Sequence, residues 1–539
     1  MQPTMQDAAP LISSLIEYAA LNHPDTEIVS RTVDGELHRY HYRDACRRAK
    51  RLANALKHLK IQRGDRVATV AWNGYRHYEL YFAVSGMGAI VHTINPRLFP
   101  DQITWIANHA KDRVLFFDLT FAPLVEKLAP LMPSIEIYVA MCDRAHMPAL
   151  KIPNLLCYED MLDAEADDFV WPAFPDTTPS ALCYTSGTTG DPKGVLYTHR
   201  STIYHCMAAA TRDALNINSN SCVLPVVPMF HVNAWGVPYI ATATGAKLVF
   251  PGAALDGASV YDLTEREKVT LSLGVPTIWL GLLNHVETQG LRFSTLQETV
   301  VGGAACPPVI IEKFKKQYGV EVVHAWGMTE TSPIGTICRL KAKHASLSED
   351  AQFAIRVKQG RAIFGVEMKI VDGHGKSLPR DGSAFGDLMV RGPWVIERYF
   401  GEEKSALVDG WFHTGDVATI DADGYMQITD RSKDVIKSGG EWISSIEIEN
   451  IAMSHPAVAE AAAIGIAHPK WDERPLLLVI LKQNAVLDKA QMLAHYEGKI
   501  AKWMLPDDVV FVTELPHTAT GKLLKRALRD QYAGRYIGK

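Results

Sequence analysis

The densest group of side chains that could do chemistry lies at residues 184–199, which read YTSGTTGDPKGVLYTH. Glycines let a backbone approach a ligand closely and turn its N–H groups inward. Such a concavity binds anions, and hydroxyls together with the ammonium of Lys193 add donors and charge. Phosphate is therefore the expected guest, although this composition is equally typical of a flexible surface loop. The candidate phosphate-binding residues are Thr185, Ser186, Gly187, Thr188, Thr189, Gly190 and Lys193.

Four other polar residues could take part in chemistry, but each also has an ordinary structural interpretation. His231 follows an apolar run, where a buried, hydrogen-bonded histidine is common. Glu330 in WGMTET could hold Mg²⁺, a hard cation, or cap a helix. Asp416 in WFHTGD could grip two hydroxyls with its two oxygens, or belong to a turn before a strand. Lys522 alone would be a solvated surface cation.

The elements that must position these residues follow from the periodicity of the apolar residues. Helices are expected over residues 42–59 and 76–88, with strands at 64–70 and 89–94. Strands that alternate with helices predict an α/β fold with mainly parallel sheets. Apolar runs on both sides predict that the 184–199 stretch contains a loop between two strands.

Two further segments combine strands with small or aromatic residues. Pro225 and Pro228 are expected to flank a strand that has His231 at its end. Residues 299–301 predict a strand that ends in a tight GGAA turn at 302–305. Small residues there would let a flat ring lie against the backbone, although a close-packed turn has the same composition.

Size and composition limit the class of protein. With 539 residues the chain is too long for one compact core, so at least two domains are expected. Hydrophobic residues make up 47% and charged residues 21%, which is ordinary for a globular protein. The net charge of −5 argues against nucleic acid or an anionic membrane as the main partner. No apolar run reaches the roughly 18 residues that a membrane span needs.

The cysteines and the first residues predict a location. The 8 cysteines are scattered without Cys-x-x-Cys or metal-ligand spacing, which predicts buried thiols in a reducing compartment. Residues 1–25 lack the basic start and long apolar core of a signal peptide. A cytoplasmic protein is therefore expected.

Five separated strings agree in order with one known family. Residues 184–199 are no Walker A sequence, because no Gly-Lys-Ser/Thr occurs within them. The full string resembles the phosphate loop of the adenylate-forming superfamily, which includes acyl-CoA synthetases, peptide-synthetase adenylation domains and firefly-type luciferases. The strings at 230–236, 302–307, 326–331 and 411–416 resemble further motifs of that superfamily. The resemblance spans nearly the whole chain.

The resemblance implies a fold and a set of ligands. The fold would be a large multi-layer α/β domain with mainly parallel sheets over residues 1–430, and a small, mobile α+β domain over residues 436–539. A hinge at 431–435 with Lys433 would join them. The ligands would be ATP, Mg²⁺, coenzyme A and a carboxylic acid, and a homodimer is expected by analogy.

The resemblance also implies a role for each matched residue. Thr185 and Glu330 would bind Mg²⁺, Asp416 would hold the ribose, and Arg431 would contact ribose or phosphate. Lys522 and Glu330 would be catalytic. The loop residues would hold the phosphates of ATP. The adenine site would comprise Gly303, Ala304, Ala305, Trp326, Gly327, Met328 and Thr329. The arm of coenzyme A would lie along Gly439, Gly440 and Glu441. The acyl pocket would comprise His231, Val232, Trp235, Gly302, Gly303, Gly327 and Pro333.

One position, His231, limits the class of carboxylic acid that could be the substrate. Amino-acid-activating members usually carry an aspartate after the phenylalanine, to pair with an ammonium, whereas this chain has His231. We therefore expect an acid without an amino group, with His231 as a catalytic residue near its carboxylate. The strings at 230–236, 302–307 and 468–472 resemble those of medium-chain fatty acyl-CoA synthetases and 3-methylmercaptopropionate–CoA ligases. A short- to medium-chain fatty acid is favoured, and the thioether acid and a longer fatty acid stay open.

Some features depart from the pattern of the family. Asp387 replaces a usual glutamate, and Arg398 stands before Tyr399 where a glycine is common. A luciferase-like oxygenase and a non-catalytic nucleotide-binding protein are the alternative functions. A pure binder has no need of Lys522.

Overall fold

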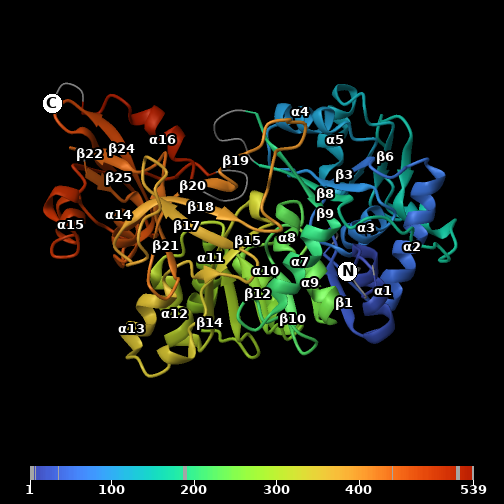
Figure 1. Ribbon diagram of the computed structural model, residues 1–539, viewed down its shortest axis with the longest axis horizontal. Helices are drawn as coiled ribbons and strands as arrows, with labels where there is room; N and C mark the ends of the chain where they lie inside the picture. The colour runs from blue at the N-terminus through green and yellow to red at the C-terminus, as the bar shows by residue number, and fades with distance from the viewer. Residues whose placement is uncertain are drawn as a thin grey trace.

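The computed structural model describes residues 5–6, 8–33, 35–185, 191–439, 441–517 and 523–536. The predicted phosphate-binding residues 186–190, Gly440 and the predicted catalytic Lys522 therefore lie outside the described residues. Figure 1 shows a larger part, coloured blue to yellow, and a smaller part at its left, coloured orange to red, that contains the C-terminal segment.

A seven-stranded sheet in the larger part follows the order β7-β6-β5-β3-β4-β8-β9. Its neighbouring strands are parallel except β8 and β9, which form an antiparallel hairpin. Strands β4 (Ile90–Thr93) and β5 (Val114–Phe117) are buried at every residue, as expected where helices cover both faces of a parallel sheet. The two strands predicted on either side of the loop within residues 184–199 are confirmed. The other strands are β3 (Arg66–Val70), β6 (Ile137–Ala140), β7 (Leu155–Cys157), β8 (Pro179–Tyr184) and β9 (Gly194–Thr198).

A nine-stranded sheet follows the order β16-β15-β14-β13-β12-β10-β11-β1-β2. It is parallel from β14 to β1 and antiparallel at both edges. The prediction of mainly parallel sheets is therefore confirmed. Its strands are β1 (Glu27–Arg31), β2 (Leu37–His41), β10 (Cys222–Pro225), β11 (Lys247–Phe250), β12 (Leu271–Gly274), β13 (Glu298–Val301), β14 (Glu321–Gly327), β15 (Ile334–Ile337) and β16 (Arg361–Ala362).

Two smaller sheets complete the fold. An antiparallel sheet holds β17 to β21, and a fourth sheet in the C-terminal part holds β22 to β26. The first comprises β17 (Glu367–Val371), β18 (Phe385–Arg391), β19 (Leu407–Val408), β20 (Trp411–Ile420) and β21 (Met426–Arg431). The second comprises β22 (Ile436–Ser438), β23 (Glu441–Ile443), β24 (Val458–His468), β25 (Asp472–Leu481) and β26 (Asp508–Phe511).

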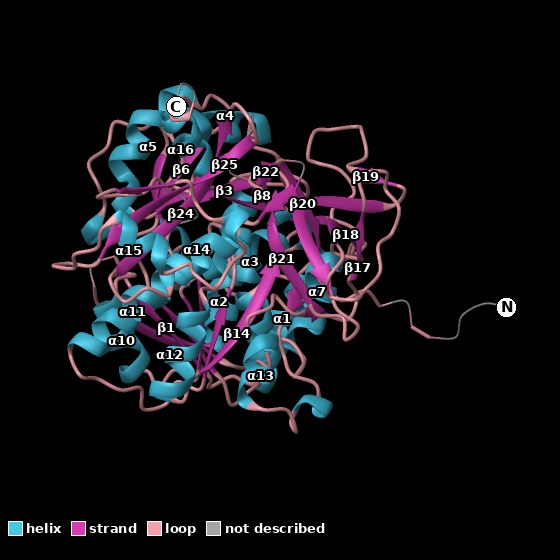
Figure 2. Ribbon diagram, turned by 90° about the vertical axis from the view of Figure 1, so that its left-hand side faces the viewer, coloured by secondary structure: helices cyan, strands magenta, loops and turns pink. Residues whose placement is uncertain are grey.

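Helices lie around the strands, as the cyan and magenta ribbons of Figure 2 show. The helices predicted at 42–59 and 76–88 are present as α2 (Tyr42–His58) and α3 (Tyr75–Gly86). None of the helices formed by the described residues is both long and apolar enough to cross a membrane. The other helices of the larger part are α1 (Ile12–Asn22), α4 (Pro100–Ala110), α5 (Ala122–Leu128), α6 (Tyr158–Asp163), α7 (His199–Ala210), α8 (Val232–Trp235), α9 (Val237–Thr244), α10 (Gly257–Arg266), α11 (Pro276–Thr288), α12 (Pro308–Tyr318) and α13 (Glu349–Arg356). The C-terminal part holds α14 (Ser445–Met453), α15 (Lys489–Ala494) and α16 (Lys525–Tyr532).

The segment before His231 differs from the prediction. Strand β10 ends at Pro225, and the described residues 226–231 form no strand. The N–H groups of Val226 and Val227 both donate to the Leu273 carbonyl oxygen, which breaks the regular ladder, and Pro228 has no N–H with which to continue it. Residues 232–235, labelled α8, have φ between 47° and 57° and form a left-handed turn. That conformation costs non-glycine residues roughly 1–2 kcal/mol each, so the surrounding structure must hold it.

Several core histidines are buried with their rings acting as hydrogen-bond acceptors. The Ile12 N–H donates to His199 Nδ1 at 3.0 Å, and the Ile334 N–H donates to His205 Nε2 at 3.3 Å. Burial lowers the pKa of His205 to about 3 and that of His199 to about 4. Burial also lowers the pKa of His324 to about 4. These rings are neutral in the folded protein at neutral pH.

We predict that the protein loses stability as the pH falls from 6.5 towards 4. The unfolded chain protonates its histidines near their ordinary pKa, whereas the folded chain protonates these three only near 3 to 4, so added protons favour unfolding. The urea midpoint, followed by tryptophan fluorescence, should fall across this window. His205→Asn should make the decline shallower, and the same change at exposed His374 should not. Equal slopes for both variants would contradict the assignment.

Candidate active site

The β8–β9 hairpin presents the predicted phosphate loop beyond one end of the seven-stranded sheet. Thr185 and Lys193 close the base of that loop. The Thr185 N–H donates to the Lys193 carbonyl oxygen at 2.9 Å, and the Lys193 N–H donates to Thr185 Oγ1 at 3.3 Å. Tyr184, the last residue of β8, has its hydroxyl 2.6 Å from His109 Nδ1. Both described ends of the loop are therefore fixed to the hairpin.

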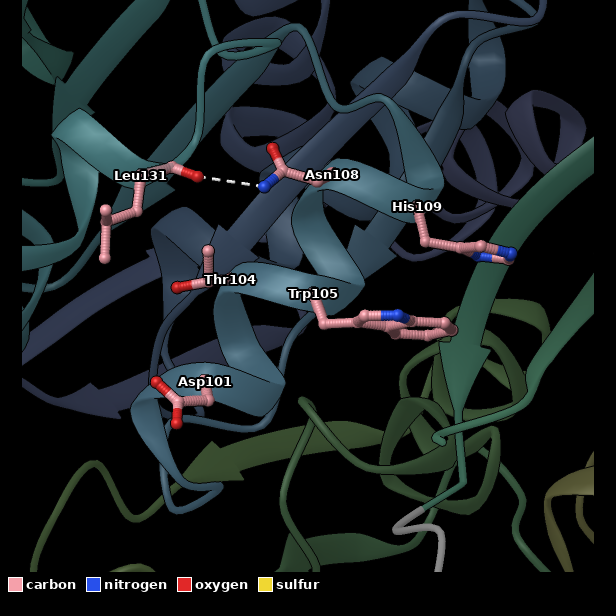
Figure 3. A pocket seen from close by; sticks show the side chains of 6 residues that line it. All are labelled: Asp101, Thr104, Trp105, Asn108, His109 and Leu131. Carbon is pink, nitrogen blue, oxygen red and sulfur yellow. Dashed lines mark hydrogen bonds between the residues drawn. The ribbon is translucent and has the colours of Figure 1, made fainter. Parts of the chain in front are cut away.

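Figure 3 shows the surface that helix α4 forms beside this hairpin. The rings of Trp105 and His109 stack with centroids 4.6 Å apart, and Asn108 Nδ2 donates to the Leu131 carbonyl oxygen at 2.9 Å. An open cavity of about 530 Å³ lies here. Its lining residues are Asp101, Thr104, Trp105, Asn108, His109 and Leu131. The sequence did not indicate this surface, because the stacked pair meets Tyr184 only through the packing of α4.

Glu330 lies in the turn Thr329–Thr331 that follows strand β14, and it is only 6% exposed. The Tyr399 hydroxyl donates to Glu330 Oε1 at 2.9 Å. The Lys193 ammonium lies over the Tyr399 ring, 4.8 Å from its centroid. The structure thus brings the predicted phosphate-binding lysine and the predicted metal-binding carboxylate to one tyrosine, which sequence reasoning had not included in the site.

Asp416 lies inside strand β20 and is 1% exposed, so the interpretation as a turn residue before a strand is wrong. Trp326 Nε1 donates to Asp416 Oδ2 at 2.8 Å, and Arg431 Nε lies 2.7 Å from Asp416 Oδ1. A buried carboxylate needs such partners, because removal from water is costly unless the charge is paired. The residues predicted for adenine and ribose therefore form one cluster.

The left-handed turn at 232–235 places Trp235 against the GGAA turn. A Cβ on Gly302 would lie 3.0 Å from Trp235 Cη2 and 3.2 Å from the Ala325 carbonyl oxygen. A glycine is therefore what lets the indole approach the backbone this closely. Gly303 follows with a φ of +79°, which a residue with a side chain seldom adopts.

The remaining residues predicted for the acyl and adenine sites flank this contact. Gly327 packs so closely on Pro333 that a Cβ would overlap the Pro333 carbonyl oxygen, and the Met328 N–H donates to that oxygen at 3.1 Å. His231 is half-buried, and its carbonyl oxygen accepts the Ala234 N–H at 3.2 Å. The other predicted residues in these turns are Val232, Ala304, Ala305 and Thr329.

The side chain of His205 packs against Gly236, directly after the left-handed turn. The sequence did not predict this contact. The His205 ring lies so near Gly236 that a Cβ there would come within 2.9 Å of His205 Cε1. Its Nε2 also accepts the N–H at the start of β15, described above. A histidine inside a helix with no motif around it gives no signal in the sequence.

Two residues predicted to contact coenzyme A lie in the C-terminal part. Gly439, with a φ of +61°, donates its N–H to the Trp471 carbonyl oxygen at 2.8 Å, and a Cβ on it would lie 3.0 Å from Trp471 Cε3. Glu441 is exposed in β23. These contacts fix Gly439 within its own part of the protein and leave the exposed Glu441 at the surface.

A buried polar network borders the predicted hinge. Asp430 is 1% exposed and accepts the Ser445 N–H at 2.6 Å and the Ser445 hydroxyl at 3.0 Å. Lys525 Nζ donates to Ser445 Oγ at 2.6 Å and pairs with Glu449 at 2.6 Å. Lys433 is exposed in the turn that follows β21. The network joins β21 to α14 and α16, and the sequence motifs gave no sign of it.

Comparisons with known proteins agree with this architecture. The AMP-binding enzyme family matches residues 16–400, and the AMP-binding enzyme C-terminal domain matches residues 447–522. The chain is 53% identical over 529 residues to a 3-methylmercaptopropionyl-CoA ligase of Ruegeria lacuscaerulensis, with 98% of each chain covered. It is 49% identical to a medium-chain-fatty-acid–CoA ligase of Ectopseudomonas oleovorans, with 97% of this chain and 96% of that chain covered.

Solved structures show the same fold over nearly the whole chain. An anthranilate CoA ligase in complex with anthranoyl-AMP matches with a TM-score of 0.86, 26% identity and 99% of both chains covered. ATP-bound MatB from Rhodopseudomonas palustris matches with a TM-score of 0.81, 25% identity, and 97% and 99% of the two chains covered. The chain therefore belongs to the AMP-binding enzyme family, within the adenylate-forming superfamily. Its relatives place it among the acyl-CoA ligases of that family, which confirms the resemblance drawn from the motifs.

We predict that Asp416→Asn weakens ATP binding about tenfold or more. The amide lacks the negative charge that Arg431 pairs with, and hydrogen bonds to a charged group contribute about 1.5–3 kcal/mol, which corresponds to a factor of about ten or more. Isothermal titration with ATP measures the change, and thermal melting monitors the fold. Asp381→Asn, in an exposed turn, is the control. Unaltered affinity in the Asp416 variant would exclude its role at the nucleotide.

Proposed function

We propose that the protein is an ATP-dependent carboxylate–CoA ligase for a short- to medium-chain fatty acid, which releases AMP and pyrophosphate. The observation that carries this proposal is that Lys193 and Glu330 both contact Tyr399. Strand β14, which leads to Glu330, also contacts Asp416 through Trp326 and lies close to Gly302 through Ala325. Charged groups that could bind a nucleotide therefore lie along the same strand as the contact between Gly302 and Trp235, where we propose the acyl chain binds. The names of the relatives support the same activity, and 3-methylmercaptopropionate and a longer fatty acid are the alternative substrates.

In the first half-reaction a carboxylate oxygen of the acid attacks the α-phosphorus of ATP. The new P–O bond gives the acyl-adenylate, and the bond to pyrophosphate breaks. Two anions must approach each other, so fixed cations and N–H donors must offset their repulsion. Lys193 and residues 185–190 would hold the phosphates, and Lys522 would deliver a second ammonium from the C-terminal part.

The oxygen atoms at this site fit Mg²⁺. Glu330 offers a carboxylate and Thr185 a hydroxyl, and this ion takes a few such protein oxygens together with phosphates and water. Among the residues that the structure describes, no group of three or more His, Cys, Asp or Glu side chains could hold a metal ion by itself. Bound there, the ion would offset the negative charge of the phosphates.

The acyl pocket accounts for the class of acid. His231 provides an imidazole near the proposed carboxylate position and no anionic counter-ion for an ammonium, so an acid without an amino group is favoured. Trp235 packs against Gly302 and would form one side of the pocket. Val232, Gly303, Gly327 and Pro333 would line the rest.

In the second half-reaction the thiol sulfur of coenzyme A attacks the acyl carbonyl carbon. A C–S bond forms, the bond to AMP breaks, and the thiol proton is lost. We propose that residues 436–539 turn about residues 431–435 at Lys433 against residues 1–430, so that Lys522 withdraws. Gly439, Gly440 and Glu441 would then lie along the arm of coenzyme A.

Location and assembly stay predictions. All 8 cysteines are buried and none is in a disulfide, which supports the predicted reducing, cytoplasmic compartment. A homodimer is proposed by analogy alone, and light scattering of the purified chain tests it.

We predict that, among straight-chain acids from acetate to palmitate, AMP release in the presence of ATP and coenzyme A is fastest with one of short to medium length. An α-amino acid should react about 100-fold more slowly or worse, because its ammonium would be left without a partner. Pentanoate and 3-methylmercaptopropionate form the sharpest pair, since a sulfur replaces one methylene. A clear preference for the thioether acid would favour the alternative substrate, and no release with any acid would exclude a ligase.

We predict that Lys522→Ala slows adenylate formation by about 100-fold or more, because a cation that offsets charge in the transition state is lost. Thioester formation from added acyl-adenylate should keep its rate, since that step does not need this ammonium. Carboxylate-dependent pyrophosphate exchange and thioester formation measure the two halves separately. Lys482→Ala, which removes an exposed lysine of the same part, is the control. Full adenylation by the Lys522 variant would contradict the role.

A further inference from the structure

Tyr399 makes two contacts that the roles proposed so far do not explain. It follows Arg398, the departure from the family pattern, in the segment between β18 and β20, and it is half-buried. Its hydroxyl donates to Glu330 Oε1 at 2.9 Å, and its ring lies 4.8 Å from the Lys193 ammonium. One side chain therefore contacts both the proposed phosphate-binding cation and the proposed metal-binding carboxylate.

The backbone around Tyr399 connects the same two places. The Ile396 N–H donates to the Glu330 carbonyl oxygen at 2.8 Å, and the Phe400 N–H donates to the Gly194 carbonyl oxygen at 2.8 Å. A Cβ on Gly194 would lie 3.0 Å from Phe400 Cβ, so the two chains also pack closely. Residues 396–400 thus connect, through hydrogen bonds, the start of strand β9 in the phosphate-loop hairpin to the turn that bears Glu330.

The chemistry of the phenol suits both contacts. The hydroxyl is a hydrogen-bond donor, and Glu330 Oε1 accepts from it. A donor to a carboxylate fixes the direction of that carboxylate. The electron-rich ring face attracts an ammonium and restricts where it can lie. The ring and the hydroxyl therefore act on different partners and can be tested separately.

We propose that Tyr399 is a positioning residue for the adenylation step: its ring orients Lys193 toward the nucleotide phosphates, and its hydroxyl orients Glu330 toward a divalent cation. This rests on the proposed function only in that the ligand is ATP with such a cation. The hydrogen bonds of residues 396–400 hold Lys193 and Glu330 at a set separation, so that phosphate binding and cation binding occur at one place.

Two substitutions separate the ring from the hydroxyl. Tyr399→Phe removes the hydroxyl and keeps the ring, so ATP affinity without a divalent cation should be unchanged. The Mg²⁺ concentration needed for half-maximal ATP binding should rise about tenfold, as expected when a hydrogen bond to a charged group is lost. Tyr399→Leu removes both groups, so ATP affinity should also fall about threefold without Mg²⁺, in line with a partly exposed cation–π contact.

Isothermal titration of the full chain with ATP, in EDTA and at several Mg²⁺ concentrations, measures these affinities without any turnover. Tyr261→Phe is the matched control. Tyr261 lies on helix α10, and its hydroxyl donates at 2.8 Å to a backbone carbonyl oxygen, that of Arg292, and not to a carboxylate. Thermal melting checks the fold of each variant. Glu330→Gln, alone and combined with Tyr399→Phe, completes a double-mutant cycle.

The outcomes decide between positioning and mere packing. If Tyr399 acts through Glu330, the double variant should need no more Mg²⁺ than Glu330→Gln alone. Equal loss of affinity with and without Mg²⁺ in Tyr399→Phe, or additive effects in the double variant, would overturn the proposal. These measurements do not depend on the acid. A wild-type chain that binds Mg²⁺ and ATP but releases no pyrophosphate would refute the ligase function and leave the inference on Tyr399 standing.

Discussion

Repulsion between two anions is the constraint on which this site depends. A carboxylate and the triphosphate of ATP must meet, and in a site that excludes water their repulsion is stronger than in bulk water, because a low dielectric screens charges less. A protein can overcome this only with charges and N–H groups that are already fixed in place, since reorganising them during the reaction would cost free energy. Two features supply such groups. Thr185 and Lys193 hydrogen-bond to each other at the base of the phosphate loop, and the Lys193 ammonium lies against the Tyr399 ring.

The residues proposed for the site come from three of the sheets. The hairpin belongs to the seven-stranded sheet, Glu330 follows a strand of the nine-stranded sheet, and Asp416 lies in the antiparallel sheet. Each buried carboxylate has its own donors, which offsets the cost of removing it from water. Residues 396–400 connect two of these three sheets through backbone hydrogen bonds to Glu330 and Gly194. These bonds restrain the separation of Lys193 from Glu330.

Local patterns predicted the elements and the residues that lie in continuous motifs. Alternating strands and helices predicted the α/β fold, and the strings around Glu330 and Asp416 gave the roles that we propose for them. Contacts between distant segments could not be predicted, because Tyr399, His205 and Lys525 meet their partners only after the sheets pack. The strand predicted between Pro225 and Pro228 is absent for a local reason, because the ladder becomes irregular at Val226 and Val227 and Pro228 has no N–H with which to continue it. The left-handed turn that follows could not be predicted, because distant residues such as His205 support it.

The junction between the two parts also contains a buried carboxylate that is stabilised by hydrogen-bond donors. Asp430 stands at the end of the larger part, yet its carboxylate binds Ser445 in the first turn of α14. Any rotation about residues 431–435 must break these bonds and leave the buried carboxylate exposed to another environment. Loss of a hydrogen bond to a charged group costs about 1.5–3 kcal/mol, an amount that a bound ligand can offset by binding one orientation more tightly. Lys525 and Glu449 would travel together with Ser445, because that pair lies wholly within the C-terminal part. The orientation seen here is held in part by these bonds at Asp430 and by the Ser444 hydroxyl, which donates to the Thr429 carbonyl oxygen. The rotation proposed above would have to break them and form others in their place.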